Sequence, residues 1–348
     1  MNLKLFRISL ICAFFLLASI FPKSGFSQEN APGGKEKKFD PTTVIMEHIG
    51  DSHFWPFTFP FVKEKLIPLP VILYTDKGLE IFSSGHLMDG ATYQGSYHSY
   101  KLEENKIKVV DASGNIDTTV RALDFSITRN VISMMLTAAL LLIVFLNVSA
   151  AYRKREGKAP KGLQSFMEPL VLFVRDDIAL PNLGAKYPKY MSLLLTIFFF
   201  ILINNLFGII PFFPGSYNLT GNIAVTAMLA VVILFTVNLN ANKHYWKHIF
   251  MPNPWWLFPI MIPVEIVSIF SKPIALMIRL FANITAGHIV ILSLISLIFI
   301  FQSLAIAPVS IIFVVFMDMI ELLVAFLQAY IFTLLSALFI GMAIEEHH

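Results

Sequence analysis

Arg279 is the residue whose type and position carry the clearest chemical consequence. It lies within the apolar run Ser271 to His288, SKPIALMIRLFANITAGH. Between Lys272 and the end of that run, no other side chain is charged apart from the titratable His288. Arginine stays protonated in proteins, and its insertion at bilayer depth costs about 2.5–3.5 kcal/mol or more. The charge must therefore face a partner, a water cavity or the interior of an assembly, which predicts that Arg279 is the centre of an ion path.

Other polar residues repeat at helical spacing on the same apolar segment. Counted from the first of them, they fall at offsets of 3, 7, 14 and 18, so they share one face of a helix: Glu265, Ser268, Lys272, Arg279 and Asn283. On the last apolar segment Glu321 and Gln328 are seven apart, and Asp318 lies about one turn before Glu321. Such a stripe predicts an ion or proton path. The alternative is that these side chains only pair with one another inside a bundle.

His288 lies nine residues after Arg279 and therefore points to the other side of an ideal helix. It would lie near Glu321 if the last helix runs antiparallel. A histidine and a carboxylate can exchange protons near neutral pH, because histidine titrates there and burial raises the pKa of a carboxyl group. A purely structural hydrogen bond between the two is the alternative.

The composition is that of a membrane protein. Of 348 residues, 56% are hydrophobic, 33 are Phe and the mean hydropathy is +0.69. Charged residues make up 14%, against about 25% in soluble domains. A net charge of +3 is too small to indicate nucleic-acid binding, and the single cysteine, Cys12, excludes an intramolecular disulfide or a multi-cysteine metal site. We expect neither a cofactor nor a resident metal, and the absence of HExxH or a nucleophile–base pair disfavours an intramembrane hydrolase.

The N-terminal part is polar and distinct from the rest. Residues 1–27 have a basic start, a short apolar core and small residues, as a secretory signal does, although a retained membrane helix is the alternative. Residues 28–125 would then be exported. They begin with a linker of disordered type, and a short helix is expected at 43–49. A β-hairpin is expected at 70–74 and 79–83, with further strands near 92–102 and 107–111. Solvated surface side chains are expected for His48, His53, His86 and His98.

Residues 126–348 form the membrane domain, and the predicted fold is an all-α polytopic membrane protein with about five membrane helices. Three spans of ordinary length are predicted at 131–148, 190–210 and 223–239, with a surface helix at 163–180. The last two apolar segments, 260–301 and 307–344, are too long: as helices each would measure roughly 55–65 Å, against a hydrocarbon core of about 30 Å. We expect them to form a strongly tilted hairpin.

The positions of the basic residues predict how the chain is oriented across the membrane. They follow the first and third predicted spans, whereas the loops at 211–222 and 301–307 have no Lys or Arg. The positive-inside rule makes the basic loops cytoplasmic. The N-terminal segment is then outside the cytoplasm, as a signal peptide also predicts, and the C-terminus is inside.

Several motifs resemble subunit a of F-type ATP synthases. They are PVEIVSIFSKPIAL, LMIRLFANITAGH, the terminal ELLVAFLQAYIFTLLSALFIGMA, and the earlier NNLFGIIPFFP and NLTGNIAVTAMLA. The motifs occur in the family's order from about Val131 to the C-terminus. The N-terminal segment departs from the family, being longer than its usual external end.

The resemblance implies a mechanism and a set of roles. It implies a non-catalytic proton-channel subunit in a bacterial inner membrane, with two half-channels against a ring of c subunits that each carry a membrane-embedded carboxylate. Peripheral-stalk b subunits and the remaining synthase subunits are the other implied partners, alongside the lipid bilayer and protons. Arg279 matches the family's essential arginine, with Asn283 and Gln328 beside it. His288 and Glu321 match the pair of the external half-channel, with acid and imidazole exchanged relative to well-known bacterial members; Glu265, Lys272 and Ser268 would line the exit path.

Two interpretations from other classes compete with this one. An ion-coupled secondary transporter or channel is the main alternative, but a transporter is expected to contain an internal repeat or broken helices, and the sequence has no visible repeat. A membrane-anchored interaction protein whose function lies in the N-terminal segment would not need Arg279.

Overall fold

The structure is a computed structural model of the chain, and its secondary structure is mostly helical, with strands confined to the N-terminal part. The residues it describes are 50–56, 66–103, 105–111, 115–117, 119–210, 219–250, 258–301 and 306–345. The predicted signal sequence, the linker and the short helix at 43–49 lie outside these residues.

The N-terminal domain consists of short antiparallel sheets. Strands β3 (Pro70–Thr75) and β4 (Gly78–Ser83) form the predicted hairpin, with Thr75 opposite Gly78. β8 (Leu123–Asp124) pairs with the other edge of β3. The second sheet contains β5 (Tyr93–Gln94), β6 (Ser99–Glu103) and β7 (Lys106–Val110), and β1 (Phe54–Pro56) pairs with β2 (Leu66–Pro68). The hairpin is therefore confirmed, as are the two later strand regions; the first of these is interrupted between Gln94 and Ser99.

The core of this domain surrounds one buried carboxylate. Side chains from both larger sheets and from the 3₁₀ segment η1 (Ser84–Gly90) pack together, among them Val71, Leu73, Phe82, Leu87 and Tyr100. Glu80 points into this core and accepts hydrogen bonds from the Tyr100 hydroxyl and from the backbone N–H groups of Ser96 and Tyr97. Three donors satisfy the charge, as a buried carboxylate requires. Burial, and then the hydrogen bond to Glu80, raise the pKa of Tyr100.

His53 corrects an expectation from the sequence. Its side chain is buried, and its Nε2 lies 3.0 Å from Oδ2 of Asp124. The expectation of a solvated surface histidine was wrong here, because the partner lies 71 positions away in sequence and becomes a neighbour only when β8 pairs with β3. Burial raises the pKa of Asp124, but the hydrogen bonds from His53 and Ser126 outweigh it, so the pKa of Asp124 lies below its ordinary value.

Hydrogen bonds join this domain to the first membrane helix, α3 (Arg129–Lys154). The backbone N–H of Arg129 donates to the carbonyl of Ser52, and the Arg129 guanidinium donates to the carbonyl of Gly50. The backbone N–H of Asn130 donates to the carboxylate of Asp51. The start of α3 is thus attached to the β-domain by contacts distant in sequence as well as by the chain itself.

Acidification should loosen the strand that precedes α3. The pKa of Asp124 is lower in the folded than in the unfolded chain, so ionised Asp124 stabilises the fold above its ordinary pKa of about 3.9. That stabilisation is lost as the pH falls through the folded value. The amide of Phe125, which donates to the carbonyl of Ile72, should lose hydrogen-exchange protection over this range.

The Asp124→Asn variant should be less protected at neutral pH and should show a flatter pH dependence. Asp111→Asn, which removes an exposed turn carboxylate, is the matched control and should keep the original profile. Identical profiles for Asp124→Asn and the unmodified chain would contradict this assignment.

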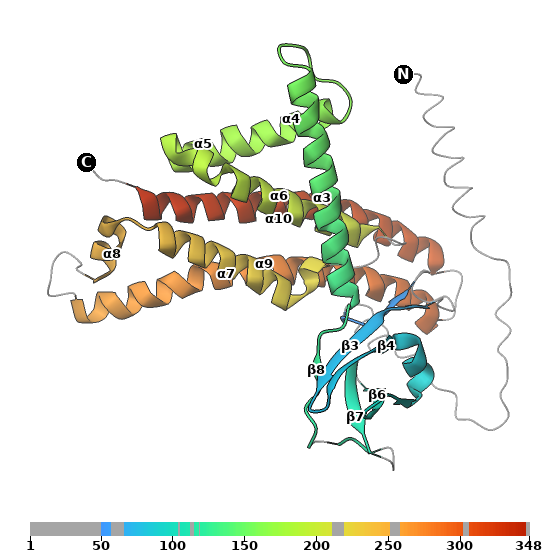
Figure 1. Cartoon of the computed structure of the whole chain (residues 1–348). Helices are drawn as coiled ribbons and strands as arrows, with labels where there is room; N and C mark the ends of the chain where they lie inside the picture. The colour runs from blue at the N-terminus through green and yellow to red at the C-terminus, as the bar shows by residue number, and fades with distance from the viewer. Residues whose placement is uncertain are drawn as a thin grey trace, which may run out of the picture. The chain divides into compact units, whose positions relative to one another are not determined.

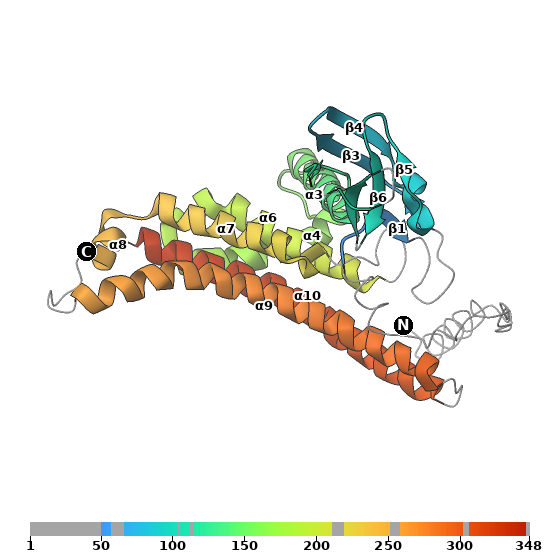
Figure 2. The same cartoon turned by 90° about the horizontal axis from the view of Figure 1, so that it is seen from below.

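The described part of the chain has five helices long and apolar enough to cross a membrane. Three contain spans of ordinary length: α3, α6 (Tyr187–Ile209), which is the last part of the longer helical stretch Leu163–Ile209, and α7 (Ile223–Asn240). The other two are α9 (Phe258–Phe301, 44 residues) and α10 (Ala307–Ile344, 38 residues). Both are continuous, even though Pro263 and Pro273 lie inside α9. The predicted fold class is confirmed, and α9 and α10 lie side by side in Figure 1 and Figure 2.

The segment predicted as a surface helix is helical and packs on its neighbours. It comprises α4 (Leu163–Phe173), the π-helical segment η2 (Val174–Ala179) and α5 (Leu180–Leu183), and the 3₁₀ turn η3 (Gly184–Lys186) connects it to α6. Its buried residues, including Met167, Val174 and Ile178, belong to the same core as α6 and α10. The inner apolar face of this segment therefore contacts protein, while Phe166 and Leu180 stay exposed.

A seam of small residues holds α10 against α6 and α5. From Ala325 to the end of α10, every fourth residue is small and buried: Ala325, Ala329, Thr333, Ala337 and Gly341. Small residues let helix backbones approach closely, and the resulting van der Waals packing favours helix association in a membrane. At Gly341 the approach is so close that a Cβ atom would collide with the backbone carbonyl oxygen of Asn182. The opposite face of α10 remains exposed, with Leu322, Leu323 and Leu327 on it.

The last turn of α10 is capped by groups from other helices. The last carbonyls of a helix have no partner within it. The backbone N–H of Asn242 donates to the Ala343 carbonyl at 2.9 Å, and its side-chain amide donates to the Ile344 carbonyl at 2.7 Å. Lys186 Nζ also donates to the Ile344 carbonyl, at 3.1 Å. Asn242 lies in the connection between α7 and the short helix α8 (Lys243–Phe250). Both of these helices also pack against α10.

Candidate ion path

Helices α9 and α10 form an antiparallel pair with a definite register. Lys272 Nζ lies 5.6 Å from the ring centroid of Phe339, near the end of α10. His288 faces Glu321, and the Ser310 hydroxyl donates to the Leu294 carbonyl at 2.8 Å. Residue numbers therefore fall on α10 as they rise on α9. In this register Arg279 is level with the turn of α10 that contains Gln328.

His288 and Glu321 come together as the sequence predicted. Nδ1 of His288 lies 3.9 Å from Oε1 of Glu321, and Glu321 is buried. The other carboxylate oxygen, Oε2, has no hydrogen-bond partner among the described residues. A Cβ atom at Gly287 would lie 3.0 Å from Oε1, so the glycine leaves the room that this carboxylate occupies. The pair is close enough to exchange a proton with little movement.

Arg279 and Asn283 point away from the rest of the chain. Both are exposed, and within the described residues the Arg279 guanidinium makes neither a hydrogen bond nor an ion pair. Their nearest neighbours along the same helix face are small and exposed: Ala275, Ala282 and Ala286. The helix surface around Arg279 is therefore formed by small side chains, which leave room for another helix to approach closely.

The remaining predicted residues divide between two environments. Gln328 is buried in α10, and no hydrogen bond joins it to Arg279 in the described structure. Glu265 and Lys272 are partly buried towards the start of α9. Glu265 lies near Tyr245 of α8. Burial raises the pKa of Tyr245, and the negative charge of Glu265 raises it further. Among the predicted ion-path residues, the structure thus brings His288 and Glu321 together.

A buried set of amides and hydroxyls was missed from the sequence. Asn205 of α6 donates to the Ala325 carbonyl at 3.2 Å and accepts from the Thr220 hydroxyl at 2.6 Å. Next to it, Asn204 accepts from the Thr137 hydroxyl of α3 at 2.9 Å. Ala325 is one turn after Glu321, so these groups extend a polar region from the His288–Glu321 pair into α6. The adjacent asparagines within an otherwise apolar span were the signal that could have revealed it.

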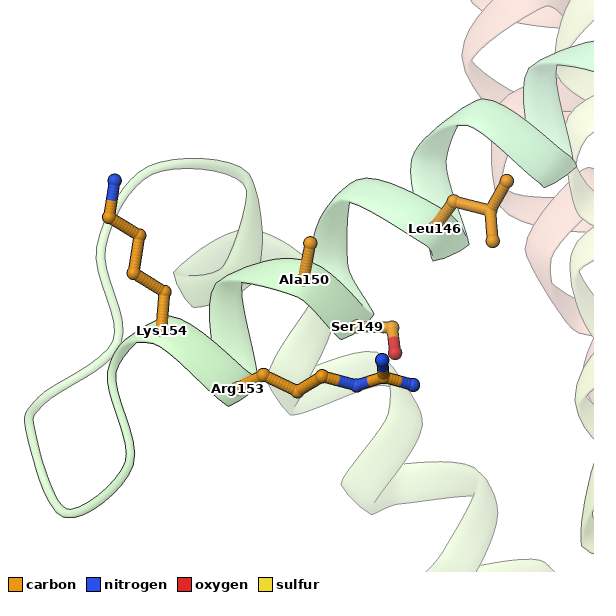
Figure 3. Close-up of a pocket in the computed structure, with 5 residues that line it drawn as sticks. All are labelled: Leu146, Ser149, Ala150, Arg153 and Lys154. Carbon is orange, nitrogen blue, oxygen red and sulfur yellow. The ribbon is translucent and has the colours of Figure 1, made fainter.

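The basic end of α3 lies apart from these residues. A surface hollow of about 440 Å³ is lined by Leu146, Ser149, Ala150, Arg153 and Lys154. Figure 3 shows how these five side chains lie at the end of α3. Arg153 reaches back beneath Ser149, while Lys154 extends away on the other side. None of the predicted ion-path residues contributes to it. Among the described residues no three His, Cys, Asp or Glu side chains are grouped to hold a metal ion.

These features define a class: a polytopic membrane protein whose over-length helix pair carries a histidine–carboxylate pair and an arginine that pairs with no described residue. Comparison with known proteins identifies the family. The family model described as "ATP synthase A chain" matches residues 131–341. The chain belongs to the ATP synthase subunit a family. It is a non-catalytic, proton-translocating part of the membrane sector of an ATP synthase complex.

Individual relatives agree with this assignment. "ATP synthase subunit a" of Chloroherpeton thalassium is 48% identical over 236 residues, which are 66% of this chain and 70% of the relative. The Myxococcus xanthus protein of the same name is 45% identical over 65% of this chain and 75% of the relative. "ATP synthase subunit a 2" of Chlorobaculum tepidum is 42% identical over 74% of this chain and 71% of the relative. Residues 44–125 match a separate family model, a domain of unknown function (DUF8433).

Replacement of Asn205 should weaken the membrane domain. Asn205→Leu removes the hydrogen bonds that Asn205 makes to two other segments, at the Thr220 hydroxyl and the Ala325 carbonyl. Interhelical hydrogen bonds in membranes average about 0.6 kcal/mol, so we expect a loss of roughly 1–2 kcal/mol in the free energy of unfolding, measured by denaturant titration in detergent micelles.

Thr236→Val is the matched control for this variant, because the Thr236 hydroxyl donates only within its own helix, to Val232. The control should change the free energy of unfolding by less than half as much. Equal effects of the two substitutions would show that the Asn205 bonds do not stabilise the helix packing.

Proposed function

We propose that α9 and α10 face a ring of c subunits and that Arg279 meets the membrane-embedded carboxylate of each ring subunit as it passes. The observation that carries this proposal is the outward direction of Arg279, without a partner in the described chain and among small exposed residues. A permanent charge at bilayer depth needs a counter-charge. The carboxylate that supplies it comes from outside this chain.

The fixed charge of Arg279 would control the protonation of the ring carboxylate. Opposite charges about 4 Å apart interact by about 4 kcal/mol at an effective dielectric constant of 20, which corresponds to about three pKa units. The arginine therefore favours the ionised carboxylate and promotes proton release. It does not carry the proton itself, because its guanidinium does not lose its charge. Asn283, one turn away, and Gln328, at the same level of α10, are proposed to orient the guanidinium.

Protons would enter on the side of His288 and Glu321. The 3.9 Å separation of this pair and the buried polar groups around Asn205 support a path through the protein at this level. Entry there lies beyond Arg279, towards the loop that joins α9 to α10. On the other side of Arg279, Glu265 and Lys272, with Ser268 between them, are proposed to line the exit. Arg279 then separates two half-channels, so a proton crosses only by travelling with the ring.

The setting of the subunit follows from its family and its charge distribution. We place it as a multi-pass protein of a bacterial inner membrane, alongside the peripheral-stalk b subunits and the remaining synthase subunits. The basic residues after α3 and around α8 support a cytoplasmic location for those loops and for the C-terminus. Residues 28–125 would lie outside the cytoplasm, after a signal sequence at 1–27, and residues 126–348 would form the membrane domain.

Arg279→Ala should abolish proton-driven ATP synthesis in an assembled complex. Without the arginine, the pKa of the ring carboxylate rises by on the order of three units, and proton release into the exit path stalls. The measurement is ATP synthesis by reconstituted vesicles under an imposed proton gradient. Ile278→Ala, at the neighbouring exposed position, is the control and should remain active. Normal proton-driven ATP synthesis by the Arg279→Ala complex would contradict the central proposal.

The exchange of acid and imidazole between α9 and α10 should be tolerated better than either single change. His288→Glu alone places two carboxyl groups together, and Glu321→His alone places two imidazoles together, so each loses the complementary pair. The double variant restores one acid and one base at these two facing positions. We expect higher passive proton flux through the membrane sector of the double variant than through either single variant. Equal loss in all three, at equal assembly, would argue against a paired role.

A further inference from the structure

One face of the N-terminal domain is apolar yet exposed. In the β4–β3–β8 sheet, residues alternate between a buried face and an outer face. Val71, Leu73 and Phe82 fill the buried side. The outer side carries Ile72, Tyr74, Leu79, Ile81, Leu123 and Phe125, which are named here the outer sheet face.

These side chains form one continuous surface. Tyr74 lies between Leu79 and Leu123 on the neighbouring strands, and Ile72 lies opposite Ile81. The backbone N–H of Phe125 donates to the carbonyl of Ile72, so Phe125 continues the surface along the edge of the sheet. The largest exposed fractions are 66% for Ile81 and 64% for Phe125.

An exposed apolar surface of this extent is expected to contact another protein or a membrane. An antiparallel sheet with one face in water normally alternates apolar and polar residues along each strand. Here both faces are apolar apart from the buried Glu80 and the strand ends. A contiguous exposed apolar patch marks a site of protein or membrane interaction.

The short connection to α3 indicates what covers it. Arg129, where α3 begins, is only four positions after Phe125, and four residues span at most about 14 Å. This connection is not free to swing: Ile127 donates its backbone N–H to Pro70, and Arg129 and Asn130 bind the segment 50–52. The sheet is therefore held close to the first turn of a membrane-spanning helix, at the level of the lipid headgroups.

The residue types fit that location. Tyrosine and other aromatic side chains are favoured at the membrane–water boundary, and aliphatic side chains beside them enter the upper acyl region. All members of the outer sheet face are uncharged, so none resists partial insertion. We propose that the outer sheet face docks on the lipid bilayer, in the leaflet where α3 begins, and so anchors the N-terminal domain flat against the membrane.

The proposal is tested by the depth of a spin label on this face in the assembled complex. Cys12 is the only cysteine, so Cys12→Ser gives a background for Ile81→Cys and Phe125→Cys, each labelled with a nitroxide. Lys106→Cys is the matched control, because Lys106 is exposed on a strand of the other sheet. The complex is reconstituted into vesicles of phosphatidylethanolamine and phosphatidylglycerol, and collisions with oxygen and with a water-soluble nickel chelate are measured.

Docking on lipid predicts a ratio of oxygen to nickel accessibility several-fold higher at positions 81 and 125 than at 106. Equal ratios at all three positions would show that the face is open to water and would overturn the proposal. Shielding of 81 and 125 from both reagents would also overturn it, because that pattern indicates a cover of protein, such as another subunit or a second copy of this chain. Both outcomes are independent of proton flux, since none of the labelled residues belongs to the ion path.

Discussion

The permanent charge of Arg279 is the constraint on which the membrane domain depends. A guanidinium at bilayer depth costs about 2.5–3.5 kcal/mol or more unless it is compensated, and no described residue of this chain pairs with it. The chain therefore leaves Arg279 exposed on a face of small residues, where a counter-charge can approach. An internal carboxylate would remove the cost, but it would also occupy the arginine permanently and end its use as a transient partner.

Firm packing behind the hairpin makes this exposure possible. The small-residue seam of α10, the capped carbonyls at its end and the Asn205 bonds all lie on the side away from the exposed leucines. Because the inner face of α10 packs against α6 and α5, the outer faces of α9 and α10 can form a long surface that no other helix of the described chain covers. The length of the two helices fits the proposed contact with a ring, because helices longer than the hydrocarbon core of the bilayer must tilt and so present a longer surface within the membrane.

Local signals in the sequence predicted what depends on local pattern. Helix lengths, the over-length pair, the hairpin at 70–83 and the approach of His288 to Glu321 all follow from periodicity, length and antiparallel connection. The sequence did not reveal the burial of His53 or the Asn205 bonds to Thr220 and Ala325, because those depend on which distant segments meet. Helical spacing also placed Arg279 and Lys272 on one stripe, but it could not show that the structure leaves Arg279 exposed and lays Lys272 over Phe339.

The same physical logic applies in the N-terminal domain and in the membrane domain. A side chain whose surroundings do not suit it, whether an unpaired arginine or an apolar sheet face in water, is costly in an isolated chain and is explained by what surrounds the chain in its assembly. For Arg279 the missing group must be anionic and must move, because a fixed anion would trap it. For the outer sheet face the missing environment must be apolar and extended, because the exposed side chains spread over three strands. The two requirements differ, so the N-terminal domain need not touch the proposed ring for its apolar surface to be covered.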